Sequence, residues 1–184
     1  MNTSIASFAV TALAAAALGR AYGIAPTAVR DGLQGFVPAR HRIAEVAEID
    51  GVHYVDDSKA TNVEAARCSI ESFPSGVVAI VGGHFKGGDL GELAVALKTH
   101  GTAAVAIGDS ADDVVAALEG AVPVTRARSM REAVERAYQA ASPAGTVLLA
   151  PACASFDWYP DGGYPARGDD FRRCVRELVA GASS

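Results

Sequence analysis

Cysteine, histidine and net positive charge are all scarce in this chain of 184 residues. The three cysteines, Cys68, Cys153 and Cys174, are an odd number without paired spacing, which argues against a disulfide framework or a cysteine zinc site. The four histidines are scattered, with no His-Glu-x-x-His pattern. A net charge of −5 provides no basic field for nucleic acid or anionic lipid. We therefore expect no metal site made by this chain alone, and neither nucleic acid nor membrane as a partner.

Long hydrophobic runs are also few. The alanine-rich apolar stretch of residues 5–18 is shorter than a membrane span. It lacks the basic flank of a signal peptide, because the first lysine or arginine is Arg20. We therefore expect a packed helix in a cytoplasmic protein. In such a reducing compartment, the cysteines should be small, mostly buried apolar residues.

Half of the residues are apolar, so a chain of this length can bury a sizeable core. Two helices are predicted first, over residues 4–22 and 26–34, because Gly23 is typical of a helix end and Pro26 of a helix start. This hairpin has too few elements to be a domain, so it should pack on something else. The predicted division is residues 1–38 for the hairpin and residues 39–184 for the main domain, with residues 36–42 as a linker.

Apolar strands alternate with capped helices in the rest of the chain. Strands are predicted over residues 43–49, 53–55, 77–81, 103–107, 122–125 and 146–150. Helices should begin at the capping sequences that start with Thr61, Asp89, Ser110 and Ser129, and a last helix should cover about 165–179. Gly51 predicts a tight hairpin between the first two strands. Continuous apolar strands between helices indicate a mainly parallel, doubly wound α/β sheet of the Rossmann-like class.

Polar residues follow three of these strands. Ligands of doubly wound sheets bind beyond the carboxyl ends of the strands, which selects the turns after Val55, Val81 and Ala150. The first turn, with Asp57 and Lys59, leads into a helix whose N–H groups favour a phosphate or carboxylate. The alternative is a solvated ion pair of little energetic weight.

The other two turns are rich in glycine and alanine. The glycines of residues 82–89 permit close approach of a ligand, and Lys86 in the middle of this loop has few neighbours to pair with. The alternative is a flexible surface loop. Residues 150–157 contain Ser155, which could donate a hydrogen bond to a carboxylate. Cys153 has no identifiable base nearby in sequence, so we interpret it as a packing residue.

These segments resemble the C-terminal domain of the MurD family, the ATP-dependent ligases that add D-glutamate to UDP-N-acetylmuramoyl-L-alanine in peptidoglycan synthesis. The resemblance covers residues 39 to about 178. It rests on four ordered motifs: Asp57-Ser58-Lys59-Ala60-Thr61-Asn62, Gly82-Gly83-x-x-Lys86-Gly87, Pro151-Ala152-x-Ala154-Ser155-Phe156-Asp157 and Arg167-Gly168-x-x-Phe171. The hairpin resembles the end of the family's central ATPase domain more weakly, through residues 11–15.

The resemblance implies a fold with one antiparallel edge strand and a reaction that uses ATP and Mg²⁺. The substrate carboxylate is phosphorylated, and the amine of D-glutamate then attacks the acyl phosphate. D-glutamate would be held by Thr61, Lys86, Ser155, Phe156 and Tyr164. The nucleotide would be faced by His41, Arg42, Asp57 and Lys59, of which Asp57 and Lys59 would take part in catalysis.

Two of these roles compete with alternatives. For His41 and Arg42, the alternative is a solvated end of the linker. For Tyr164, the rivals are Trp158 and Tyr159, because the segment between the third and fourth motifs is about two residues longer than the family pattern.

A phosphate-binding loop of the Gly-Lys-Ser/Thr type is missing from the sequence. We therefore predict that this chain alone, as a monomer, binds no cofactor tightly and does not catalyse ligation. Turnover by the purified chain with UDP-N-acetylmuramoyl-L-alanine, D-glutamate and ATP would contradict this prediction. Two alternatives remain: a stand-alone amino-acid-binding or regulatory module, and a nucleotide-binding enzyme that does not respond to D-glutamate.

Overall fold

The computed structural model describes residues 3–37 and 39–182. Its internal contacts divide the chain into two compact units, residues 1–39 and residues 40–184. The boundary expected from the sequence, at Pro38, falls on a residue outside the described ranges.

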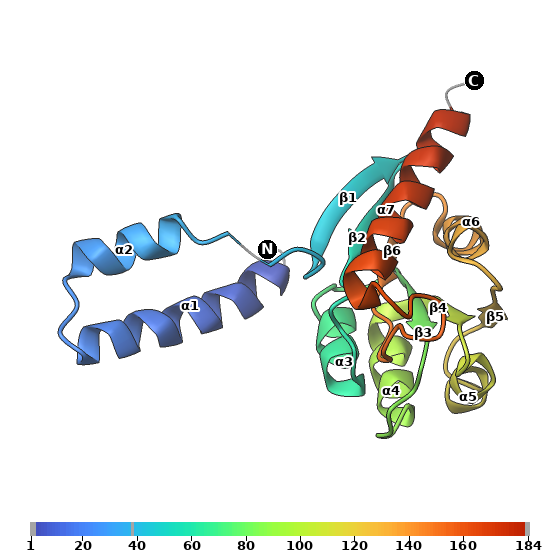
Figure 1. The fold of residues 1–184 in the computed structure, drawn as a ribbon, viewed down its shortest axis with the longest axis horizontal. Helices are drawn as coiled ribbons and strands as arrows, with labels where there is room; N and C mark the ends of the chain where they lie inside the picture. The colour runs from blue at the N-terminus through green and yellow to red at the C-terminus, as the bar shows by residue number, and fades with distance from the viewer. Residues whose placement is uncertain (1–2, 38, 183–184) are drawn as a thin grey trace. The chain divides into compact units, whose positions relative to one another are not determined.

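The first unit is a helical hairpin (Figure 1). Helix α1 spans Thr3–Ala21 and helix α2 spans Pro26–Gln34, which agrees with the predicted pair. Gly23 has a φ of +79° between them, the left-handed conformation that commonly ends a helix. Leu18 and Tyr22 are exposed. No helix in the described part of the chain combines the length and the apolar character needed to cross a membrane.

The second unit is built on a six-stranded sheet with the strand order β1-β2-β6-β3-β4-β5. The strands are β1 Ala44–Ile49, β2 Val52–Asp56, β3 Val77–Gly82, β4 Gly101–Ile107, β5 Val124–Arg126 and β6 Thr146–Leu149. Strand β1 pairs antiparallel with β2 at one edge, and all other neighbours are parallel. The predicted doubly wound, mainly parallel sheet with one antiparallel edge strand is confirmed.

Helices cover both faces of this sheet (Figure 1). Helices α3 (Val63–Glu71), α4 (Gly91–His100) and α5 (Ala111–Ala117) pack on one face, and α6 (Met130–Ala141) and α7 (Gly163–Ala182) pack on the other. Side chains of β3 alternate between the two cores, with Ala79 in the first and Ile80 in the second. A strand buried on both faces needs apolar residues throughout, which explains the unbroken apolar run of β3.

The predicted hairpin turn and one predicted helix start are confirmed. Asp50 and Gly51 join β1 to β2 with φ values of +50° and +81°, as a tight two-residue turn requires. Ser129 caps α6, because its hydroxyl oxygen accepts a hydrogen bond from the Glu132 N–H at 3.2 Å.

The other three predicted caps differ from the structure in detail. Asn62, not Thr61, caps α3, and its side-chain oxygen accepts a hydrogen bond from Ala65. Leu90 occupies the cap position of α4, but the Asp89 carboxylate, one residue earlier, accepts a hydrogen bond from the Gly91 N–H at 2.8 Å. Ser110 stands at the start of α5, but its hydroxyl makes no capping hydrogen bond and lies 3.5 Å from a cysteine sulfur. At α3 and α5 neighbouring polar groups compete with the local capping pattern.

Candidate functional site

Main-chain hydrogen bonds join the three turns that follow β2, β6 and β3. The N–H of Ala152, after β6, donates to the carbonyl of Ala60, after β2, at 2.9 Å. His84, after β3, exchanges two backbone hydrogen bonds with Ala154, at 2.8 and 3.0 Å. The turn after β6 therefore links the other two at the carboxyl edge of the parallel strands, where doubly wound sheets bind ligands. The structure thus brings together the three turns that the sequence selected.

The glycine-rich loop after β3 contains Lys86 and needs glycine at its start. Gly83 has a φ of +134°, and a Cβ on this residue would lie 2.3 Å from the Ala154 carbonyl oxygen. Further along, a Cβ on Gly88 would lie 3.3 Å from a methyl group of Val63, so the loop passes the first turn of α3. Lys86 is exposed and makes no ion pair or hydrogen bond within the described residues. An unpaired ammonium group in a loop that passes a helix start suits an anionic ligand.

Lys59 lies against Tyr164. Its Nζ donates to the Tyr164 hydroxyl at 3.1 Å and lies 4.8 Å from the ring centroid, within cation–π range. The Tyr164 carbonyl also accepts a hydrogen bond from the Ser58 hydroxyl at 2.8 Å. Tyr164 is therefore fixed at the turn after β2 by its side chain and its main chain.

The two rival aromatic residues point to other parts of the molecule. Trp158 packs against the core between the sheet and helices α6 and α7. The Tyr159 hydroxyl donates to Asp170 at 2.7 Å, and burial together with that carboxylate raises the pKa of Tyr159. Of the three candidates, Tyr164 is the aromatic residue that contacts Lys59.

The remaining residues expected to hold an amino acid differ in accessibility. Ser155 is buried, with 2% of its surface exposed, whereas its neighbour Phe156 is 60% exposed. Thr61 is partly buried, and its N–H donates to the Lys59 carbonyl at 2.8 Å. These residues lie on the joined turns, and Phe156 presents most of its ring to solvent.

His41 and Arg42 are adjacent in sequence but differ in environment. His41 is 2% exposed, and its Nδ1 lies 2.8 Å from a carboxylate oxygen of Asp56. The alternative of a solvated linker end is therefore wrong for His41, and the enclosed ring presents almost no surface to a nucleotide. Arg42 is exposed, and its positive charge acts on the nearby carboxylate of Asp57.

Asp57 is a buried carboxylate with 6% of its surface exposed. Burial raises its pKa above the ordinary value of 3.8, although the Ser69 hydroxyl, the Ile43 main chain and the Arg42 charge oppose the rise. The folded protein therefore binds a proton at Asp57 more tightly than the unfolded chain does.

This shift predicts a pH-dependent effect of the Asp57→Asn substitution. Because the folded-state pKa is the higher one, the free energy of unfolding falls as the pH rises from 3.8 through that pKa. The variant lacks this cost, so it should be more stable than the parent chain at neutral pH, and its advantage should disappear in acid. Urea unfolding of both proteins across this pH range measures the difference. A difference that does not change with pH would contradict the prediction.

Arg167 connects helix α7 to two of the joined turns. Its side chain is 1% exposed, and it donates to the Ser58 hydroxyl at 3.0 Å and the Ser58 carbonyl at 2.9 Å. It also donates to the carbonyls of Cys153 and Ala154, at 3.1 and 3.2 Å. Burial lowers the pKa of Arg167 to about 10, so the guanidinium remains protonated at neutral pH. Sequence reasoning had assigned this residue no role.

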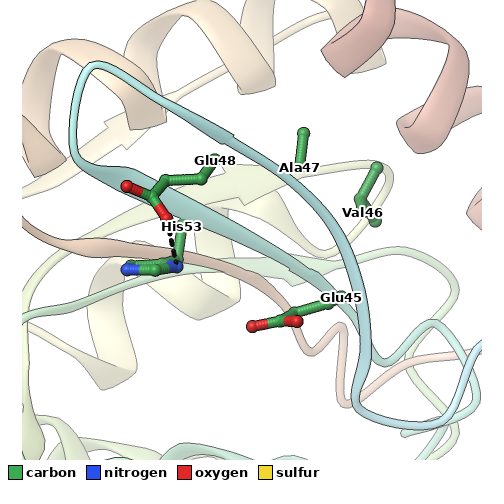
Figure 2. A pocket seen from close by; sticks show the side chains of 5 residues that line it. All are labelled: Glu45, Val46, Ala47, Glu48 and His53. Carbon is green, nitrogen blue, oxygen red and sulfur yellow. Dashed lines mark ion pairs between the residues drawn. The ribbon is translucent and has the colours of Figure 1, made fainter.

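Two surface hollows lie at other places. Figure 2 shows the first, at the β1–β2 edge, where Glu48 and His53 form an ion pair at 3.8 Å. The second is lined by residues of α5, β5 and the segment between them. Neither hollow contains Lys59 or Lys86.

The cysteines are unpaired in the structure. Cys153 and Cys174 are buried, as expected, but Cys68 is exposed on α3. The Cys153 sulfur lies 3.5 Å from the Ser110 hydroxyl, and burial raises the pKa of this thiol. A raised pKa disfavours the nucleophilic thiolate, which agrees with a packing role for Cys153.

Residues 41–153 match the family model described as Mur ligase, glutamate ligase domain. This chain belongs to that family. The match contains the turns after β2 and β3 and ends within the turn after β6, so Lys59 and Lys86 lie inside it and Ser155 and Tyr164 lie beyond it. The family expected from the four motifs is confirmed.

Several similar curated proteins share one name. A UDP-N-acetylmuramoylalanine–D-glutamate ligase from Frankia casuarinae is 51% identical over 168 residues, which are 90% of this chain and 35% of that protein. The protein of the same name from Streptomyces coelicolor is 48% identical over 177 residues, which are 92% of this chain and 37% of that protein. The chain thus spans little more than a third of the length of these Mur ligase relatives.

Solved structures share the fold. A UDP-N-acetylmuramate-alanine ligase from Thermotoga maritima superposes with a TM-score of 0.65 at 19% identity, over 92% of this chain and 37% of that one. A folylpolyglutamate synthase from Mycobacterium tuberculosis, complexed with ADP, gives 0.53 at 16% identity, over 70% of this chain and 33% of that one. At these identities the likeness concerns the Mur ligase fold.

Sequence reasoning missed two residues that contact the site: Arg167, and Arg172, whose Nε donates to Asp56 at 2.7 Å. For Arg167 the sequence contains an indirect signal, which is the glycine that follows it, Gly168. In the structure a Cβ on Gly168 would lie 2.2 Å from the His41 ring. A glycine inside a helix at such a point indicates close packing. For Arg172 the sequence carries no such signal.

Proposed function

We propose that this chain is the D-glutamate-binding part of an ATP-dependent ligase that adds D-glutamate to UDP-N-acetylmuramoyl-L-alanine in peptidoglycan synthesis. The observation that carries the proposal is the joining of the three turns that hold Lys59, Lys86 and Ser155. The names of relatives at 48% and 51% identity support the choice of amino acid. In this proposal residues 1–38 are a remnant of a central ATPase domain, and the enzyme acts in the cytoplasm as a monomer.

D-glutamate carries two carboxylates, and the site offers matching groups. Lys86 is exposed and unpaired within the described residues, two positions before Gly88, where the loop passes the first turn of α3. We assign it one carboxylate, with Thr61 and Ser155 as hydrogen-bond donors. Phe156 and Tyr164 would cover the carbon chain. This arrangement holds the amine in place for attack, which is how positioning contributes to an amide-forming reaction.

ATP with Mg²⁺ would supply the phosphoryl group that activates the substrate carboxylate. The residues fit a nucleotide in part, since Arg42 is exposed and Lys59 is partly buried, whereas His41 is enclosed. We propose that Arg42 and Lys59 contact the phosphates of ATP and that Asp57 also faces the nucleotide. His41 would act through its main-chain carbonyl, which accepts the Lys59 N–H at 3.1 Å. A fixed lysine can stabilise charge that develops during phosphoryl transfer.

The proposal is tested by exchanging the C-terminal part of the Streptomyces coelicolor ligase, over the matched 177 residues, for this chain. We expect the exchanged enzyme to ligate D-glutamate and not L-glutamate. Lys86→Ala should raise the KM for D-glutamate by about tenfold to a hundredfold, the loss of one charge-assisted contact.

Lys98→Ala is the matched control, because Lys98 is an exposed lysine in the last turn of α4, outside the joined turns. It should leave the KM unchanged. A folded exchanged enzyme without D-glutamate-dependent activity would overturn the proposal, and so would equal effects of the two lysine substitutions. The isolated chain, which contains no Gly-Lys-Ser/Thr loop, should show no turnover in the same assay.

A further inference from the structure

Asp56 is a completely buried carboxylate at the end of β2, next to the proposed nucleotide-facing Asp57. It accepts hydrogen bonds from Arg172 Nε at 2.7 Å and from the Ser58 N–H at 3.0 Å. His41 Nδ1 lies at 2.8 Å, and because an ionised carboxylate only accepts, Nδ1 is the donor. Asp56 therefore ties the segment before β1, the turn after β2 and helix α7 to one point.

The segment before β1 adopts a backbone conformation that needs support. His41 has a φ of +60° and Ile43 a φ of +43°, and the left-handed region is unfavourable for residues with side chains, most of all β-branched ones. Such conformations persist where the surrounding structure holds them. The His41 ring is held by Asp56 and fits against α7 only because residue 168 is glycine.

This segment also sets the position of Lys59. The His41 carbonyl accepts the Lys59 N–H at 3.1 Å, and Asp56 holds the preceding Ser58 N–H. A change at Asp56 would therefore affect the position of Lys59 in two ways, through the His41 main chain and through the turn after β2.

We propose that Asp56 and Arg172 are positioning residues for Lys59, and that they act by holding the His41 segment against the turn after β2. The carboxylate supplies the acceptor for all three donors, and Arg172, with 20% of its side chain exposed, neutralises its charge. The role of Lys59 towards ATP rests on the proposed function, whereas the positioning itself is a property of this chain and can be measured without a ligand.

The test is amide hydrogen exchange of the 184-residue chain, followed by NMR. In Asp56→Asn the side-chain amide would oppose the Arg172 and His41 donors, so the Lys59 amide should exchange about tenfold faster or more. Arg172→Met should have a similar effect, and Arg172→Lys should restore part of the protection. The amide of Ile80, in the middle of the sheet, reports global unfolding and should accelerate by a smaller factor than the Lys59 amide.

Arg173→Met is the matched control on the next position of α7. Arg173 is exposed and pairs with Asp170 and Glu177, not with Asp56. In the Arg173→Met variant, we expect the Lys59 amide to exchange at the same rate as in the parent chain. The proposal is overturned if Lys59 keeps its protection in both Asp56→Asn and Arg172→Met, or if Ile80 exchanges faster by the same factor. Should Asp56→Asn not fold, Arg172→Met decides the question.

The exchanged enzyme adds a functional measurement. There, Arg172→Met should lower kcat about tenfold while the KM for D-glutamate stays within about twofold, because Lys59 faces the nucleotide in the proposal. An inactive exchanged enzyme would count against the proposed function, and the amide exchange rates would still decide whether Asp56 and Arg172 position Lys59.

Discussion

Arg167→Met is expected to lower the free energy of unfolding by about 3 kcal/mol, one of the two largest effects predicted for this chain. Methionine retains most of the apolar volume but leaves the carbonyls of Ser58 and Cys153 without a donor, while the Ala154 carbonyl keeps the His84 N–H. Each buried acceptor without a partner costs about 1–3 kcal/mol, and the loss is partly offset because a buried charge is removed. The turns after β2 and β6 should separate first, since Arg167 connects these two turns to α7.

Thermal and urea unfolding of the parent chain and the variant measure this effect. For a domain of this size, a loss of about 3 kcal/mol corresponds to a melting temperature lower by roughly 10 °C. Arg176→Met, on an exposed position of the same helix, is the control and should change the free energy of unfolding by less than about 0.5 kcal/mol. Equal stability of the two variants would show that the Arg167 hydrogen bonds do not hold the turns.

The second large effect concerns catalysis. In the exchanged enzyme, Lys59→Ala should reduce kcat by about a hundredfold to a thousandfold, as the loss of a preorganised group that stabilises developing charge typically does. Lys59 is preorganised because its main chain is held by His41 and its ammonium group by Tyr164. Since the group acts on the nucleotide, the KM for D-glutamate should change much less than kcat.

Steady-state kinetics with varied D-glutamate and ATP separate these parameters. Lys59→Arg is the informative partner variant, because it retains the charge but replaces a compact ammonium group with a planar guanidinium. It should recover only part of kcat. If Lys59→Ala left kcat unchanged and raised the KM for D-glutamate, Lys59 would contact the amino acid and not the nucleotide.

The local sequence pattern was sufficient to predict the architecture of the sheet and its helices. The apolar run of β3 indicated a strand buried on both faces, and Gly51 indicated the hairpin turn that places β1 at the edge. These features depend on neighbours within a few residues, which a sequence shows directly. The capping residue of α3 was less predictable, because both Thr61 and Asn62 can satisfy the first N–H groups.

By itself the sequence determined the order of the elements, the mainly parallel sheet, the ligase family and the three turns that carry the candidate residues. Only the tertiary structure decided that His41 is enclosed, that Tyr164 is the aromatic residue at Lys59, and that Asp56 and Arg167 organise the site. The physical reason is separation along the chain: Arg167 and Ser58 are 109 positions apart, and Arg172 and Asp56 are 116 apart. Such contacts form only when α7 packs on the sheet, so the local periodicity of the sequence does not predict them.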